Sequence, residues 1–454
     1  MPRLLAGTRP AATARHQGGA VLRTAQHRTA QQADVVIVGA GIAGLAAAHH
    51  LTGAGATVSV LEADSRVGGR MATDEVDGFR LDRIGQLLST AHPELRRTPG
   101  LDGLVLRAFA PGVLVHSGGR RRRFAEGRGA RGALTTARAL ASAPRPLDQA
   151  RLSAALARLA TTDDGRLARR AETTAAGAAA AWGLPARSSD SFLHPLLTAL
   201  LLDRELGSSS RVADLALRDF ARGRLCLPEG GCGTLPERLA AALPPGTVRT
   251  GVHVTAASTS VVSTKEHGEI GCRALLVATG ARAAAELLPG LRVPDFHPVT
   301  VLHHSVPQPP PVGSSLVLDG DRSGPVSHTA VLSAVDPTRA PAGRTLVTST
   351  VPGRSPAGID RPVRAQLSAL YGVPTEDWEL LAVHHDPEAV PAMTPPHDPR
   401  RPVRVLSGLY VCGDHRDTGS AQGALRSARR AAHAVLRDFG MSPSHLPHGL
   451  PQVA

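Results

Sequence analysis

The clearest pattern of apolar and polar positions lies in residues 34–62. Residues 35–38, Val-Val-Ile-Val, form an unbroken apolar run that is typical of a parallel strand covered on both faces. An alanine-rich stretch through residues 46–51 follows and ends near two glycines, and residues 58–61 form a second short apolar run. This order predicts a strand, a helix and a second strand in a parallel sheet.

Three glycines occupy the turn between the first predicted strand and the helix. Gly39, Gly41 and Gly44 have the spacing G-x-G-x-x-G. In a dinucleotide-binding unit the first glycine permits a tight turn, the second lets the backbone approach a pyrophosphate, and the third lets helix and strand pack closely. Glu62 ends the second strand, where a carboxylate accepts hydrogen bonds from an adenosine ribose. The pattern therefore predicts a dinucleotide at the helix N-terminus.

A basic segment with two glycines, Arg66-Val67-Gly68-Gly69-Arg70, follows the second strand. The glycines let the chain pass close to a diphosphate, and the arginines would neutralise it. With this segment, residues 34–73 resemble the N-terminal signature of the FAD-dependent amine oxidase superfamily, which includes protoporphyrinogen oxidases and phytoene desaturases. The resemblance implies that FAD is the cofactor and that Glu62 and Arg70 contact it.

The resemblance recurs in three later segments. Residues 77–86 resemble the family's strand and turn near the flavin. Residues 227–254, followed later by residues 275–280, resemble its second contribution to the cofactor domain, in which a valine matching Val254 contacts the adenine. Residues 409–432 resemble its last motif, in which Asp414 would bind the ribitol and the following helix would direct its positive end at the flavin. The FAD contacts expected in all are Gly39, Gly41, Ile42, Gly44, Glu62, Arg66, Gly68, Gly69, Arg70, Gly85, Val254, Gly413, Asp414, Gln422, Gly423 and Ala424.

We therefore expect an α/β protein with a discontinuous, Rossmann-like FAD-binding domain and an inserted substrate lobe of mixed sheet and helical cap. The FAD-binding domain would comprise residues 34–95, 222–295 and 400–440, and the substrate lobe residues 96–221 and 296–399. Leucines at 152, 156 and 159 have helical spacing, whereas residues 297–351 hold strand-like runs separated by Pro and Gly. Residues 1–33 are predicted to be a disordered, arginine-rich tail, and residues 441–454 a second tail.

Composition and charge limit the classes of partner that the protein is expected to bind. The chain has 454 residues, 42% of them hydrophobic, and no apolar run near the roughly 20 residues that a bilayer requires. Its net charge of +13 rests on arginine, since Lys265 is the single lysine, and we attribute this bias to a GC-rich bacterial genome. No aromatic residues interleave with the basic runs as a platform for nucleic acid requires. We expect a small-molecule substrate, no nucleic acid and no transmembrane segment; peripheral membrane contact and the oligomeric state stay open.

Cysteine and histidine usage suggests neither disulfides nor a metal. The four cysteines show no C-x-x-C pair and no regular framework, which favours free thiols and a cytoplasmic location. Three pairs of adjacent histidines, at residues 49–50, 303–304 and 384–385, lack ligand spacing, because neighbouring residues on a strand point to opposite faces. We therefore expect no metal site.

The catalytic residues are harder to predict than the cofactor, because a flavin accepts the hydride itself. His415, beside Asp414, is the one weak candidate for proton transfer. Many flavin amine oxidases hold a lysine against the flavin and cage the substrate with aromatic residues, but Lys265 lies in a predicted hairpin near the adenine end, and Tyr and Trp are scarce. These departures favour the desaturase or protoporphyrinogen oxidase branches, which act on large apolar substrates.

The sequence thus predicts an FAD-dependent oxidoreductase that transfers a hydride from a C–C or C–N bond of an apolar small molecule to the flavin N5. Two alternatives stay open. One is an NAD-dependent dehydrogenase that uses the same glycine motif, and the other is a flavin-binding protein that has lost catalysis. The substrate and the electron acceptor are not specified by the sequence.

Overall fold

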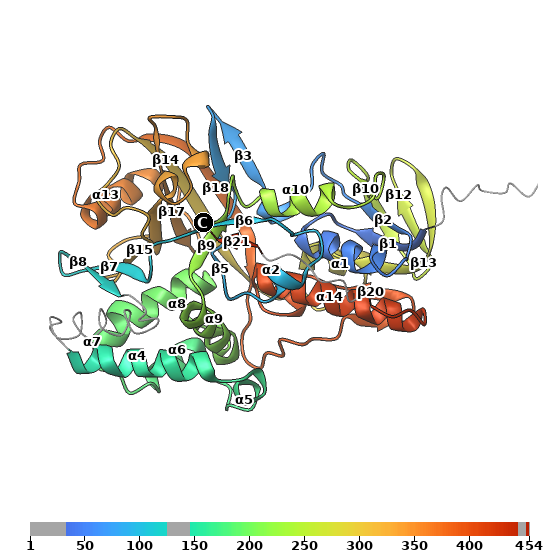
Figure 1. Ribbon diagram of the computed structural model, residues 1–454, viewed down its shortest axis with the longest axis horizontal. Helices are drawn as coiled ribbons and strands as arrows, with labels where there is room; N and C mark the ends of the chain where they lie inside the picture. The colour runs from blue at the N-terminus through green and yellow to red at the C-terminus, as the bar shows by residue number, and fades with distance from the viewer. Residues whose placement is uncertain (1–32, 125–145, 444–450, 454) are drawn as a thin grey trace, which may run out of the picture.

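The computed structural model of the chain describes residues 33–124, 146–443 and 451–453 (Figure 1). The predicted N-terminal tail, apart from residue 33, and residues 444–450 and 454 of the predicted C-terminal tail lie outside the described residues. In the described part no helix is both long and apolar enough to cross a bilayer.

An eight-stranded sheet is built around the predicted strand–helix–strand unit. Its main path runs β10–β2–β1–β13–β12–β11, with β20 beside β13 and β19 beside β20. The pairs β10–β2, β2–β1, β1–β13 and β13–β20 are parallel. The bounds are β1 (Ala33–Val38), β2 (Val58–Leu61), β10 (Val248–Arg249), β11 (Val254–Ala257), β12 (Val261–Thr264), β13 (Gly268–Val277), β19 (Arg404–Leu406) and β20 (Leu409–Val411).

The apolar run of β1 is buried on both faces. Val35 and Ile37 face a core formed with α1 (Ile42–Thr52) and α14 (Ala421–Asp438), whereas Val36 and Val38 face the core on the opposite side. Figure 1 shows α1 and α14 packed side by side along the sheet. Alanines on both helices are fully buried, and such small side chains allow the helices a close approach. This explains why the pattern contains so many alanines.

A seven-stranded sheet forms the second large layer, at the other end of the molecule in Figure 1. Its order is β18–β14–β17–β16–β15–β7–β8, and all neighbours are antiparallel except β15 and β7. One face packs on α13 (Asp360–Tyr371). The strand bounds are β7 (Val113–Ser117), β8 (Arg120–Phe124), β14 (Phe296–Val306), β15 (Val317–Asp319), β16 (His328–Val331), β17 (Thr345–Pro352) and β18 (Glu379–Pro391).

Helices gather against the other face of this sheet, below it in Figure 1. Leucines 152, 156 and 159, predicted to share one helix face, are all buried in their common core. The helices are α4 (Pro146–Thr161), α5 (Asp164–Ala168), α6 (Ala175–Ala180), α7 (Ala186–Ser188), α8 (His194–Leu201) and α9 (Ser210–Arg222), with a π-helical turn at Ser189–Leu193.

A four-stranded sheet, in the order β21–β6–β9–β5, combines strands from both predicted domains. The division between an FAD-binding domain and a substrate lobe therefore stays a prediction, although the two large sheets belong mainly to one or the other. The remaining bounds are β3 (Thr73–Val76), β4 (Phe79–Asp82), β5 (Leu88–Ser89), β6 (Val105–Ala108), β9 (Leu225–Pro228), β21 (Gln452–Val453), α2 (Glu94–Arg97), α10 (Thr234–Ala241), α11 (Ala281–Leu287), α12 (Leu332–Val335) and 3-10 turns at Gly69–Met71, Pro337–Arg339 and Asp414–Arg416.

Candidate functional site

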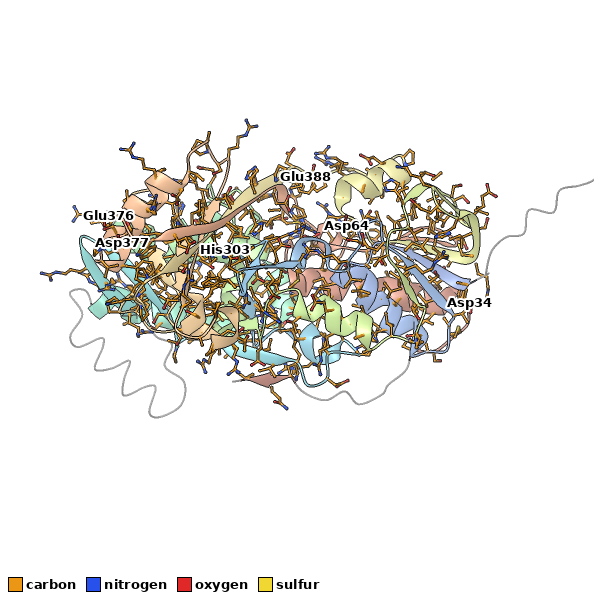
Figure 2. All side chains as sticks on the ribbon, turned by 90° about the horizontal axis from the view of Figure 1, so that it is seen from above. Asp34, Asp64, His303, Glu376, Asp377 and Glu388 are labelled. Atoms are coloured by element: carbon orange, nitrogen blue, oxygen red, sulfur yellow. The ribbon has the colours of Figure 1, made fainter. Side chains whose placement is uncertain are left out.

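An elongated cavity of about 700 Å³ runs from the eight-stranded sheet toward the seven-stranded sheet. The carboxyl ends of β1 and β2 line it, and Glu62, Val254 and Asp414, which the sequence predicted to meet, line it together. Glu388 of β18 lines it too, and Figure 2 shows this residue midway between Asp34 at one end of the molecule and Asp377 at the other. We call this cavity the cofactor slot. It lies where ligands of open parallel sheets usually bind, beyond the carboxyl ends of the strands.

The three glycines after β1 have three different surroundings. A Cβ on Gly39, whose φ is +104°, would lie 3.1 Å from the backbone of Ala278. A Cβ on Gly44 would lie only 2.0 Å from the carbonyl oxygen of Gly39, so this glycine brings helix and strand into contact. A Cβ on Gly41 would meet no atom within 4 Å, and Gly41 and Ile42 both line the slot. Because Gly41 has no side chain, a ligand in the slot can approach the backbone closely at this position.

Glu62 is held in place by backbone donors. The N–H of Ala40 donates to Glu62 Oε2 at 2.6 Å, and the N–H of Asp64 donates to Oε1 at 3.0 Å. The carboxylate is thereby fixed at the end of β2, half-buried at the edge of the slot. Each carboxylate oxygen has two lone pairs, so both keep capacity for a further donor such as a ribose hydroxyl.

The two predicted arginines point to different places. Arg70 lines the slot, and its guanidinium donates to Asp414 Oδ1 at 2.8 Å and to the carbonyl of Ala389 at 2.8 Å. Arg66 does not line the slot; its guanidinium pairs with Asp74 at 2.5 Å on the surface. Gly68 and Gly69 between them both have positive φ and line the slot, and Gly68 forms a β-bridge with Gly41.

Asp414 follows Gly413, whose φ is +141°, and both residues line the slot. Burial raises the pKa of the Asp414 carboxyl, but the charge and hydrogen bonds of Arg70 outweigh it, so that the pKa lies below its ordinary value. The carboxylate is thus held ionised at the slot. Arg70, which lies far from Asp414 in the sequence, forms an ion pair with this carboxylate. The two charges neutralise each other beside the expected cofactor.

The start of α14 divides its residues between two cavities. Ala424 lines the slot, together with Ser420 and Ala421, which the sequence did not predict. Gln422 lines a neighbouring cavity instead, and its side-chain oxygen accepts from the N–H of Glu94 at 3.2 Å. Gly423 is packed against Thr418: a Cβ on Gly423 would lie 2.0 Å from the carbonyl oxygen of Thr418. The N–H of Gly423 donates to Ser420 Oγ, which caps the helix.

Gly85 also faces away from the slot. It lines a small cavity under the seven-stranded sheet, where a Cβ would lie 2.5 Å from Thr350 Oγ1. Gln86 and Ile84, on either side of it, line the slot.

His415 is almost fully buried and lines neither large cavity. Its ring lies against Gly413, and neither ring nitrogen has a hydrogen-bond partner among the described residues. Burial lowers the pKa of His415 to about 4, so the ring is neutral at physiological pH. His415 therefore lies behind the lining of both cavities, and a role in proton transfer stays a prediction.

Two further groups of slot residues were not among the predicted FAD contacts, although residues 275–280 were predicted to belong to the cofactor domain. Thr279, Gly280 and Ala281 follow β13, and the signal was present, because β13 is a parallel neighbour of β1 and ends at the same edge. Asp386 and Glu388 of β18 come from the other large sheet, and only the tertiary structure brings them to the slot. Glu388 is paired with Arg282, and Asp386 accepts from the N–H of Glu388.

One group of three residues in the described part of the chain, His116, Asp319 and Asp321, has side-chain ligand atoms within 4.8 Å of one another. Both carboxylates already accept hydrogen bonds: Asp319 from Ser323, and Asp321 from Ser117. The expectation of no metal stays a prediction.

A second cavity of about 460 Å³ adjoins the slot. Gln86, Pro391 and Ser420 line both. It lies between α9, β18 and the start of α14. In the described part of the chain, none of Trp182, Tyr371, Trp378 and Tyr410 lines either cavity, so neither is flanked by a Tyr or Trp cage.

Comparisons with known proteins agree with this geometry. Putrescine oxidase from Kocuria rosea is 53% identical over 73 residues, which are 16% of this chain and 15% of that protein. Carotenoid 3,4-desaturase from Haloarcula japonica is 57% identical over 49 residues, 11% of this chain and 10% of that protein. The chain thus matches less than a fifth of the length of these relatives. The solved structure of putrescine oxidase bound to putrescine is 19% identical, with a TM-score of 0.65 over 90% of this chain and 99% of that one, which shows the fold.

The family itself is identified over most of the chain, since the sequence model described as flavin containing amine oxidoreductase matches residues 42–436. This confirms the resemblance, the fold class and the place of the chain in a family of flavin-containing oxidoreductases, as the sequence predicted. The slot is lined by Gly41, Glu62, Arg70 and Asp414, which come from the segments whose sequence resembles this family. The chain therefore belongs to the family of flavin-containing amine oxidoreductases.

Proposed function

We propose that this chain oxidises a small, largely apolar molecule by hydride transfer from a C–C or C–N bond to FAD. The observation that carries the proposal is the joining of two cavities. The slot is lined by most of the residues expected to bind the cofactor, and the second cavity begins where Gln86, Pro391 and Ser420 are shared. A substrate in the second cavity would therefore lie next to the part of the slot that these three residues line, which we call its inner end.

The chemical character of the residues that line the slot supports FAD as the cofactor. Val254 and Glu62 suit the adenosine, because Glu62 is a fixed acceptor for ribose hydroxyls. Gly41 leaves open space at the N-terminus of α1, where free N–H groups and the helix dipole favour a diphosphate. Arg70 and Asp414 suit the ribityl chain and its surroundings. When bound, FAD supplies the hydride acceptor, its N5.

The chain's own residues provide position and electrostatics. The N-terminus of α14, beside Ser420 and Ala421, presents the positive end of an 18-residue helix to the inner end of the slot. The apolar side chains of the second cavity exclude water from a bound substrate and hold it by burial. We assign no catalytic acid or base: the hydride passes from the substrate C–H to the cofactor, and the proton that the oxidised bond also loses passes to water.

The test begins with the purified protein and its visible spectrum. We expect flavin absorption bands and, on denaturation, release of FAD. Anaerobic mixing with matched panels of amines, porphyrinogens and polyenes should then bleach the flavin with at least one panel. A colourless protein that takes up no FAD would overturn the proposal, and so would a flavoprotein that none of the panels reduces. The second outcome would leave the alternative of a flavin-binding protein without catalysis.

A further inference from the structure

The second cavity has an apolar floor of a size that suits a substrate. Its volume of about 460 Å³ lies within the range of ligand pockets in proteins, roughly 300–1,000 Å³. Apolar side chains from α8, α9 and β18 and the strands beneath form the floor, among them Leu88, Leu201, Phe220, Leu225, Val390 and Met393. An apolar body would be stabilised here by about 25 cal/mol for each Å² that it removes from water.

One wall of the same cavity is strongly basic. Arg426, Arg429 and Arg430 come from α14, which also borders the slot, and Arg218 comes from α9. The lining arginines in the described part of the chain number six and the lining carboxylates three, Glu94, Asp164 and Asp219. The cavity therefore carries a net positive charge from its own lining. Such a wall repels an ammonium group and attracts an anion.

Two of these arginines keep an unused donor. Arg218 has a side chain only 8% exposed and ion-pairs with Asp164; its buried Nε makes no hydrogen bond among the described residues and lies 3.9 Å from Asp219 Oδ1. The Nε–H of Arg430 is likewise buried without a partner, although its other nitrogens donate to the carbonyls of Arg401 and Arg416. Both Nε–H groups are enclosed by protein, so an anion in the cavity would interact with the charge of these guanidinium groups rather than with the Nε–H itself.

The surroundings of Arg430 point the same way. Burial lowers the pKa of its guanidinium, Asp417 raises it, and neighbouring Arg426 lowers it again, so that the net pKa lies below the ordinary value. Asp417 is shared between Arg426 and Arg430. One carboxylate thus serves two arginines, and the cationic forms gain from a further negative charge.

We propose that the second cavity binds an amphipathic anion, an apolar molecule that carries a carboxylate or phosphate group, with the acid against the arginine wall and the apolar body on the floor. This deepens the proposed function, on which it rests, by naming the substrate class. Planar guanidinium groups bind such oxyanions through paired N–H donors. The putrescine bound to one structural neighbour is the opposite kind of molecule, a diamine.

The test measures binding rather than turnover. Four probes with the same ten-carbon chain, decanoate, decyl phosphate, decylammonium and decanol, are titrated into the full-length protein at low salt in a calorimeter. We expect at least one of the two acids to bind about tenfold or more tightly than decylammonium, and the tighter acid identifies the anionic group. Decylammonium or decanol binding as tightly as both acids would overturn the proposal.

Variants locate the effect. Arg430→Gln and Arg218→Gln should each weaken the tighter acid about fivefold or more and leave decanol unchanged. Arg121→Gln, an exposed arginine of β8 outside the cavity, is the matched control and should bind like the wild type. If Arg218→Gln fails to fold by circular dichroism, Arg430→Gln and the probe series still decide. Unchanged acid binding in a folded Arg430→Gln protein would overturn the assignment of the wall.

The same samples separate the two proposals, because calorimetric heat requires no flavin. FAD content is measured on each sample from its absorbance after denaturation. Loaded protein without a preference for acids would reject the anion site and leave the proposed oxidation intact. Protein that takes up no FAD but prefers acids would reject the proposed function and keep the anion site.

Discussion

Arg70 and Asp414 lie 344 residues apart in the chain and form a two-point ion pair at the cofactor slot. Arg70 Nη2 donates to Asp414 Oδ1 at 2.8 Å, and Nη1 lies 2.7 Å from Oδ2. The pair joins the glycine-rich segment after β2 to the turn before α14, two of the segments that form the slot. Its geometry is the bidentate kind that makes arginine–carboxylate pairs specific.

Arg70→Gln should weaken both the fold and cofactor retention. Asp414 would keep the N–H of His415 as a donor but lose its opposite charge. We expect the free energy of unfolding to fall by about 1–3 kcal/mol and less FAD to survive gel filtration, as read from flavin absorbance per protein. Arg66→Gln is the matched control, because the surface pair of Arg66 with Asp74 contributes only about 0–1 kcal/mol. Equal FAD loss in both variants would contradict the role given to Arg70.

Gly41→Val should remove the cofactor without removing the fold. The φ of Gly41 is −72°, which any residue adopts, and its Cβ would enter open space inside the slot. We expect the melting temperature of the apoprotein to stay near the wild-type value and FAD affinity to fall about tenfold or more, a loss of about 1.4 kcal/mol.

Gly44→Ala is the contrasting variant. Its Cβ would lie 2.0 Å from the carbonyl oxygen of Gly39, so α1 would have to move from β1. We expect a marked loss of folded protein by circular dichroism with or without added FAD. A folded Gly44→Ala protein beside a misfolded Gly41→Val protein would reverse the roles assigned to the two glycines.

Arg339→Met should destabilise the chain strongly. The guanidinium is fully buried and donates to Asp82 Oδ2 at 2.6 Å and to Asp336 Oδ2 at 3.2 Å. Removing it leaves buried carboxylates without their cation, which costs about 3–5 kcal/mol in urea unfolding. The double variant Arg339→Met with Asp82→Asn should recover part of that loss. Arg344→Met, a half-exposed pair with Glu379, is the control and should cost about 1 kcal/mol or less.

His303→Asn should make stability less sensitive to acid. His303 is fully buried between Thr348 and the carbonyl of Asp82, and burial lowers its pKa to about 4. The unfolded chain therefore takes up a proton at about pH 6.5 that the folded chain refuses until about pH 4. The stabilisation from the neutral ring is complete above pH 6.5 and is lost as the pH falls toward 4.

This loss amounts to about 3 kcal/mol, at about 1.4 kcal/mol for each pKa unit. Urea unfolding at pH 7 and pH 4.5 should show the wild type losing more stability than the variant. Burial raises the pKa of Asp219 to about 6 and acts in the opposite sense, but it is common to both proteins and cancels in the comparison. Identical losses in the two proteins would contradict the assignment.

Much of the cofactor-binding part of the fold could be predicted from short stretches of the sequence. The apolar run at residues 35–38 and the glycine spacing after it are read within one stretch of about thirty residues, and both appear as predicted in β1 and α1. Burial on both faces of a parallel strand forces a continuous apolar run, and close helix–strand packing forces a glycine at residue 44. Such constraints act between near neighbours, so they leave a local trace.

The orientation of single side chains was not legible in the same way. Arg66 and Arg70 were both predicted to contact FAD, and so were Gln422 and Ala424 at the start of α14. In the structure only Arg70 and Ala424 line the slot, whereas Arg66 and Gln422 face elsewhere. Which one does so depends on how each segment is rotated against its neighbours. That rotation is set by packing with distant parts of the chain.

The sequence by itself determined the cofactor, the family and the parallel unit that holds the dinucleotide, because a diphosphate imposes its demands on adjacent backbone atoms. Only the tertiary structure decided the second cavity and its charge. Arg218 of α9 and Arg430 of α14 are 212 residues apart in the chain, and no sequence pattern indicated that they line one cavity. Their shared environment exists only after α9 and α14 are placed beside β18, since burial and net charge in a cavity are sums over residues that the linear chain keeps apart.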